Sequence, residues 1–126
     1  MDTQALVWSQ LSARKLSRGA ASAMQRARKR GELAVSTITL FELGNLIERN
    51  QIATREAPET LIRRFTEDLL LKPVTAEIAI AASQLPPDFP RDPGDRIIAA
   101  TARVENIPLI TADRRIQASK LIKTIW

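Results

Sequence analysis

Apolar residues recur along this chain with two different periods, which alternate from one segment to the next. Over residues 16–27 they recur at helical intervals, and the run Arg28-Lys29-Arg30-Gly31 that follows is typical of a helix C-terminus. Residues 33–36 form a short apolar run between polar neighbours, which predicts a buried strand.

The rest of the chain repeats this alternation. The pattern predicts further helices over 39–47, 61–70, 78–85, 92–105 and 112–119, and further strands over 71–74, 108–111 and 121–126. Four of the seven prolines fall between 85 and 93, so that segment is predicted to be a loop. Strands that alternate with helices favour an α/β domain with a mostly parallel sheet.

Length and composition restrict the chemistry available to such a fold. The 126 residues are enough for a single domain, 1–126. The sequence has no Cys and no His, which excludes a disulfide framework, Cys/His zinc sites and nucleophiles of the Ser-His or Cys-His type. It has neither a long apolar run nor the pattern of a secretory signal, so we expect a cytoplasmic protein without a membrane span. Any catalysis must therefore rest on carboxylates.

Formal charge is unevenly distributed along the chain. The net charge is +5, yet residues 1–30 carry seven basic side chains against Asp2 alone, and residues 111–126 are basic as well. A basic exterior beside an acidic centre suits a protein that holds a polyanion near carboxylates. The Arg28-Lys29-Arg30 run has two interpretations that the sequence leaves open: compensation of a helix dipole, and contact with RNA.

Four acidic residues fall where strands end or helices begin, which is where functional groups gather in a parallel sheet. They are Asp2, Glu42, Asp95 and Asp113. Taken singly, most of them fit structural roles: Glu42 fits a capping box with Thr39, and Asp95 and Asp113 fit acids in a first helical turn. Taken together, they would repel one another unless a cation lay among them. Oxygen ligands favour Mg²⁺ or Mn²⁺, and such a site beside basic surface suits phosphodiester hydrolysis.

The segments around these acids carry a family resemblance that covers almost the whole chain. In order they are Asp2-Thr3 with Ala5-Leu6-Val7-Trp8; Gly31-Glu32-Leu33-Ala34-Val35-Ser36 leading into Phe41-Glu42-Leu43; Asp92-Pro93-Gly94-Asp95-Arg96-Ile97-Ile98-Ala99-Ala100-Thr101-Ala102; Thr111-Ala112-Asp113-Arg114-Arg115-Ile116; and Thr124-Ile125-Trp126. The chain resembles a PIN-domain ribonuclease of the VapC toxin type. The Asp-Pro-x-Asp-Arg and Thr-Ala-Asp segments are specific in combination.

The resemblance implies a three-layer α/β/α sandwich with a small, mostly parallel sheet. It also implies an endoribonuclease that depends on Mg²⁺ or Mn²⁺, a cognate VapB-like antitoxin that blocks the site, and a homodimer. The acidic site residues that it implies are Asp2, Glu42, Asp95 and Asp113. Of these, Asp2 and Asp95 are the most expected metal ligands. The basic residues expected to contact RNA are Arg96, Arg114 and Arg115.

Two features depart from the family pattern. Met1 precedes Asp2 directly, so the first strand is nearly absent; we expect either a start upstream of Met1 or a poorly anchored Asp2. Gln4 also stands where a His is common. A poorly anchored Asp2 would favour an alternative function, a catalytically impaired module that binds RNA or antitoxin. A phosphoacceptor receiver domain shares this size and order, but its acidic pair and its Lys do not occur in the required positions.

Overall fold

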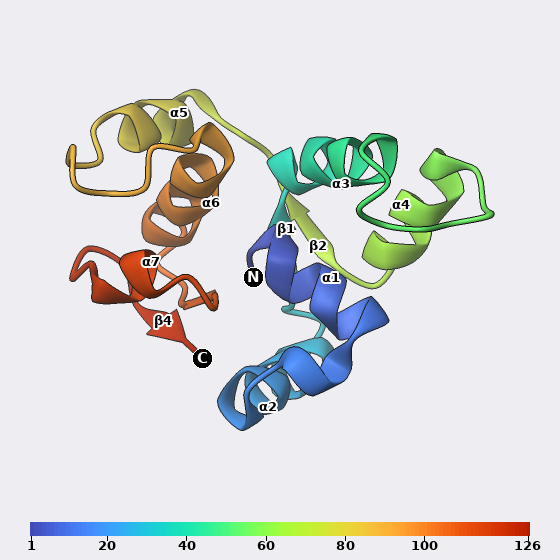
Figure 1. Cartoon of the computed structure of the whole chain (residues 1–126). Coiled ribbons are helices and arrows are strands. Elements are labelled where there is room, and N and C mark those ends of the chain that lie inside the picture. Colours follow the sequence, from blue (N-terminus) through green and yellow to red (C-terminus); the bar gives the residue numbers. More distant parts are fainter.

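The computed structural model describes all residues, 1–126, and contains seven α-helices and four short strands, with two helices before each of the first three strands and one before the last. The helices are α1 (Thr3–Leu11), α2 (Arg18–Lys29), α3 (Ile38–Glu48), α4 (Pro58–Thr66), α5 (Ala76–Ser83), α6 (Pro93–Val104) and α7 (Arg114–Ala118), with a 3₁₀ turn, η1, at Ala13–Lys15. The strands are β1 (Ala34–Ser36), β2 (Leu70–Lys72), β3 (Leu109–Ile110) and β4 (Thr124–Ile125). The predicted α/β class is confirmed (Figure 1).

The strands form two parallel pairs rather than one continuous sheet. β1 pairs with β2 and β3 pairs with β4. Between the pairs lie the first two residues: the Met1 amino group donates to the Ala34 carbonyl of β1 at 2.8 Å, and the Asp2 N–H donates to the Ile110 carbonyl of β3 at 3.0 Å. Both residues therefore connect the two pairs as the end of a central strand would, and Figure 1 shows the N-terminus at this central position.

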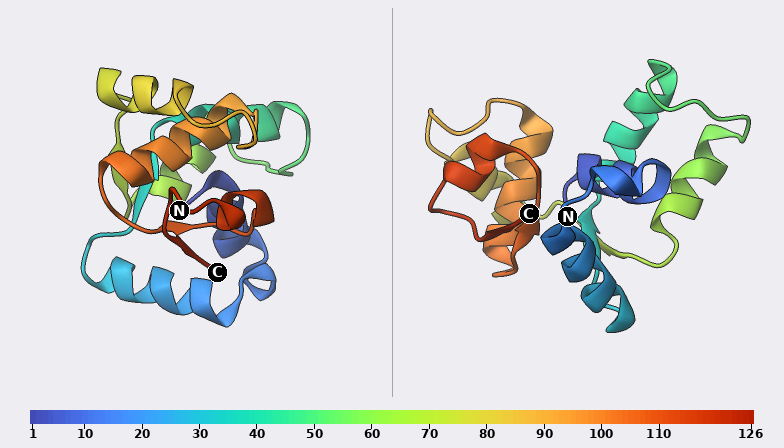
Figure 2. Two further views of the ribbon diagram at one scale, coloured as in Figure 1. Left: turned by 90° about the vertical axis from the view of Figure 1, so that its left-hand side faces the viewer. Right: turned by 60° about the horizontal axis from the view of Figure 1, so that its bottom comes forward.

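Three groups of buried apolar side chains hold the helices around these strands. The largest joins α1, α2, α3 and α4 to β1 and β3, with Phe65 and Leu43 each 1% exposed at its centre. A second lies among α6, α7 and β3, and a third fills the interface of α5 and α6. Helices α5 and α6 lie side by side in both views of Figure 2. The C-terminus is held near α1 by Trp126, whose ring lies 5.7 Å from that of Trp8.

The N-terminal ends of the helices explain several local choices in the sequence. Thr75, Asp92 and Asp113 each cap the helix that follows, because a side-chain oxygen accepts a backbone N–H of the first turn. The capping box predicted from Thr39 and Glu42 is wrong. The residue before α3 is Thr37, it makes no side-chain cap, and Thr39 lies fully buried inside the helix.

The structure also shows how α2 ends and what the basic side chains of its last turn contact. Gly31 has a φ of +66°, the left-handed conformation that ends many helices, as the sequence predicts. Arg28 pairs with Asp68 at 2.6 Å and Arg30 pairs with Glu32 at 2.6 Å. All four side chains are exposed, so these ion pairs contribute little stability, and both interpretations of the basic run remain predictions.

None of the helices is both long enough and apolar enough to span a membrane.

Candidate active site

Asp2 is fixed by its position between the two strand pairs. Its residue is 9% exposed, its N–H donates to Ile110, and its Oδ1 accepts the Ala5 N–H at 2.7 Å as the N-cap of α1. The sequence pattern does not predict helix α1, because residues 5–8 show only a short apolar stretch after Asp2. The expectation that Asp2 is poorly anchored is therefore wrong, and the impaired module that depended on it loses its basis.

Glu42 reaches the same region from α3. Its Oε2 accepts a hydrogen bond from the Thr3 hydroxyl, whose oxygen also lies within hydrogen-bond distance of Thr39 Oγ1, at 3.0 Å. Its Oε1 lies against Gly94 in the first turn of α6, where an added Cβ would overlap the carboxylate. Glu42 thus joins the N-terminal turns of α1 and α6, where the positive ends of helix dipoles favour a negative charge.

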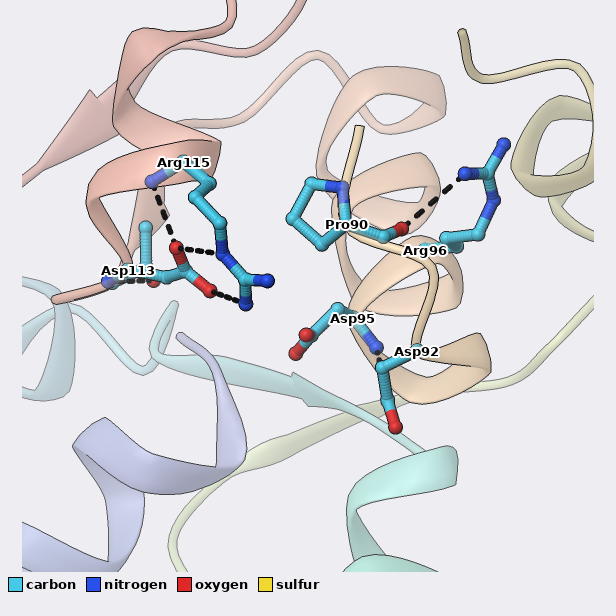
Figure 3. Close-up of polar contacts among 7 residues, drawn as sticks. Pro90, Asp92, Asp95, Arg96, Asp113 and Arg115 are labelled. Atoms are coloured by element: carbon cyan, nitrogen blue, oxygen red, sulfur yellow. Dashed lines mark hydrogen bonds and ion pairs between the residues drawn. The ribbon is translucent and has the colours of Figure 1, made fainter. Parts of the chain in front are cut away.

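Asp95 and Asp113 complete the arrangement from α6 and α7. Asp95 lies in the first turn of α6, and its N–H donates to Asp92 Oδ1 at 3.1 Å. Asp113 follows β3 and is held by its own N–H, which donates to the buried hydroxyl of Thr111 at 3.0 Å. Figure 3 shows the Asp95 carboxylate pointing toward the side of the site where Asp113 and Arg115 lie.

The pKa values show that the four carboxylates share one electrostatic environment. Burial raises the pKa of Asp2 and of Glu42, and the hydrogen bonds from Thr111 and Thr3 oppose the increase. Burial also raises the pKa of Asp95 to about 6, with further increases from four neighbouring acids: Asp92, Asp113, Glu42 and Asp2. Crowded, partly desolvated carboxylates disfavour their own ionised forms, and a cation among them would reverse that effect.

The donor set suits a hard divalent cation. All four side chains offer only oxygen, which is what Mg²⁺ and Mn²⁺ prefer. As they stand, no three acidic side chains are arranged to ligate one ion directly. The residues are thus close enough to perturb one another's pKa values but not closed around a common centre.

Among the predicted RNA contacts, Arg96 lies in a different environment from the one expected. Its guanidinium is directed away from the acids and donates to backbone carbonyls of the segment 82–90 (Figure 3). The acceptors are Ala82 at 3.1 Å, Pro90 at 3.3 Å, Pro86 at 3.5 Å and Leu85. These hydrogen bonds favour a structural role for Arg96 over the predicted RNA contact, because its N–H groups are used inside the protein.

Arg114 and Arg115 are both exposed beside Asp113, and their contact with RNA stays a prediction. Arg115 donates to both Asp113 oxygens, with Nη2 at 2.8 Å from Oδ2 and Nε at 3.3 Å from Oδ1. This pairing holds the pKa of Asp113 below its usual value.

Two residues of the site were missed by sequence reasoning. Thr3 positions Glu42, and its proximity to Asp2 in the sequence was the available signal. Gly94 leaves space for the Glu42 carboxylate, and a glycine inside a first helical turn was the corresponding signal, since Gly is a poor helix former.

The fold and the acids at the strand ends define a known class. The sequence model of the PIN-domain family matches residues 1–120 of this chain, so the chain belongs to that family. Within that family it is of the VapC type. It is 32% identical over 128 residues to "Ribonuclease VapC22" from Mycobacterium tuberculosis, a match that covers 100% of this chain and 96% of that protein.

A solved structure shows the same fold. It is the VapBC2 complex from Rickettsia felis bound to a DNA fragment from its promoter, which matches with a TM-score of 0.74 at 17% identity. The match covers 97% of this chain and 92% of that one. At this identity the likeness concerns the fold.

Proposed function

We propose that this protein is a metal-dependent endoribonuclease that hydrolyses RNA phosphodiester bonds, and that it is the toxin of a toxin–antitoxin pair. The observation that supports the proposal is that Asp2, Glu42 and Asp95 of a PIN fold have pKa values raised by burial and by neighbouring acids, Asp113 among them. The family membership and the ribonuclease relative support the same reaction class.

Each acid has a distinct part in the proposal. Asp2 and Asp95 would hold Mg²⁺ or Mn²⁺, and Glu42 and Asp113 would complete the site directly or through water. The ion would supply a water molecule of lowered pKa and would stabilise the charge that develops on the phosphate. The protein keeps the carboxylates in place through the Thr3 hydroxyl, the helix N-termini and the strand contacts of residues 1–2.

The partners follow from charge and from the relatives. Arg114 and Arg115 lie beside Asp113 and are exposed, so they are positioned to bind the RNA backbone next to the reacting phosphate. A VapB-like antitoxin would cover the site, as the solved relative is a VapBC complex. We propose that the protein acts in the cytoplasm and forms a homodimer, which sedimentation of the purified chain would test.

The substitution Asp95→Asn tests the metal-dependent reaction. Asn keeps the size of the side chain but removes the charge that a hard cation requires, so single-turnover cleavage of a labelled RNA in Mn²⁺ should fall by about 100-fold or more. Asp88→Asn is the matched control, because Asp88 is an exposed acid of the 85–93 loop. Full cleavage by Asp95→Asn, with Asp88→Asn equally active, would refute the assignment of Asp95.

A further inference from the structure

Arg115 is the cationic side chain that is paired with an acid of the site. Its guanidinium contacts both oxygens of Asp113, and its backbone N–H donates to the same Oδ1 at 2.8 Å. Figure 3 shows the guanidinium on the side of Asp113 that faces Asp95. The electrostatic effect of Asp95 on Arg115 agrees with this placement.

This pairing places Arg115 in competition with any other cation for Asp113. A carboxylate whose oxygens accept two guanidinium N–H groups offers fewer lone pairs to a metal ion. Arg115 is a weak competitor for Asp113, because its side chain is 68% exposed and an exposed ion pair contributes little stability. A long, exposed side chain can therefore leave Asp113 at small cost.

Arg114 shows that the arrangement is specific. It precedes Arg115 directly, is exposed like it and carries the same charge, but it makes no ion pair with Asp113 or any other acid. A difference between the two arginines thus reports on the Asp113 contact and not on net charge.

We propose that Arg115 is the internal counter-ion of the acidic site: it occupies Asp113 until a divalent cation binds there, and the released guanidinium then contacts the phosphate of the RNA. The proposal rests on the proposed function, since it concerns the same metal site and the same substrate. The guanidinium fork fits either a carboxylate or a phosphate, so the exchange conserves its hydrogen bonds.

Metal binding without RNA tests the first half. Mn²⁺ affinity is measured by electron paramagnetic resonance on the wild-type chain, Arg115→Ala, Arg114→Ala and Asp113→Asn. We expect Arg115→Ala to bind Mn²⁺ about two- to five-fold more tightly than Arg114→Ala, the range that an exposed ion pair provides. Equal affinities in these two variants would overturn the competition.

RNA binding tests the second half. The acidic site is kept intact, and binding of a fluorescein-labelled single-stranded phosphorothioate RNA, which resists hydrolysis, is titrated at several salt concentrations with Mn²⁺ present. Arg115→Ala should weaken binding and reduce the salt slope by about 0.7, the value for one lost phosphate contact. An unchanged slope would overturn the phosphate contact.

The two proposals fail in distinguishable ways. If wild-type protein binds no Mn²⁺, or if Asp113→Asn binds it as well as wild type does, the metal site at Asp113 is wrong and both proposals fall. If Mn²⁺ binds and RNA is cleaved but Arg115→Ala matches Arg114→Ala, only the counter-ion role is refuted. Circular dichroism of each variant confirms that the exposed substitutions leave the fold unchanged.

Discussion

Replacing Arg96 with Ala should destabilise the protein without altering its electrostatic attraction to RNA. The guanidinium of Arg96 donates to four carbonyls between residues 82 and 90, and it lies 5.9 Å from the ring of Phe89. A hydrogen bond that involves a charged group contributes about 1.5–3 kcal/mol. Two of the four contacts are long, at 3.3 and 3.5 Å, and Arg96 is only partly buried, so water can replace part of the loss. We therefore expect about 2–4 kcal/mol of lost stability.

Urea denaturation followed by circular dichroism measures this loss. Arg91→Ala is the matched control, because Arg91 is exposed in the same loop and its substitution removes the same charge. Arg96→Lys should recover little, since one ammonium cannot reach four carbonyls in a fixed fork. The interpretation is refuted if Arg96→Ala unfolds at the same urea concentration as Arg91→Ala while its RNA-binding salt slope falls, because that combination is expected of a phosphate contact.

Two further predictions concern the acidic site. Gly94→Ala should remain folded, since Ala favours helices, but it should cleave RNA at least about 10-fold more slowly because the new Cβ displaces Glu42. Asp95→Asn should be about 1 kcal/mol more stable than wild type in EDTA at pH 7, and the order should reverse in Mn²⁺; Asp88→Asn should show neither effect.

Much of the secondary structure was predictable because its signals are local. The proline-rich loop, the Asp92-Pro93 start of α6 and the glycine at the end of α2 depend on residues that are neighbours in the sequence. Helix α1 was missed because its apolar residues are read equally well as a strand over so short a span. Its start is set by Asp2, whose position depends on Ile110.

The identities of the four acids could be predicted, but their surroundings could not. The position of each acid at a strand end or first turn is visible in the sequence. The contact between Thr3 and Glu42 joins residues 39 positions apart, and nothing local distinguishes it from a capping box. The surroundings of Arg96 could not be predicted for a similar reason, because the carbonyls that it binds come from a loop whose path depends on the packing of α5 and α6.

The anchoring of Asp2 shows how residues 1 and 2 support the candidate site from between the two strand pairs. A central strand would supply two things here: backbone hydrogen bonds to both neighbouring strand pairs, and an aspartate at its carboxyl end. Met1 and Asp2 supply both, since one bonds to Ala34 and the other to Ile110. The arrangement carries a cost, because the amino group of Met1 is buried and its pKa is lowered to about 6. Burial in turn excludes water from Asp2, and it raises the pKa of that carboxylate and thereby strengthens its preference for a nearby cation. The burial of Asp2 between the two strand pairs thus supports the proposed cation site at this edge of the strands.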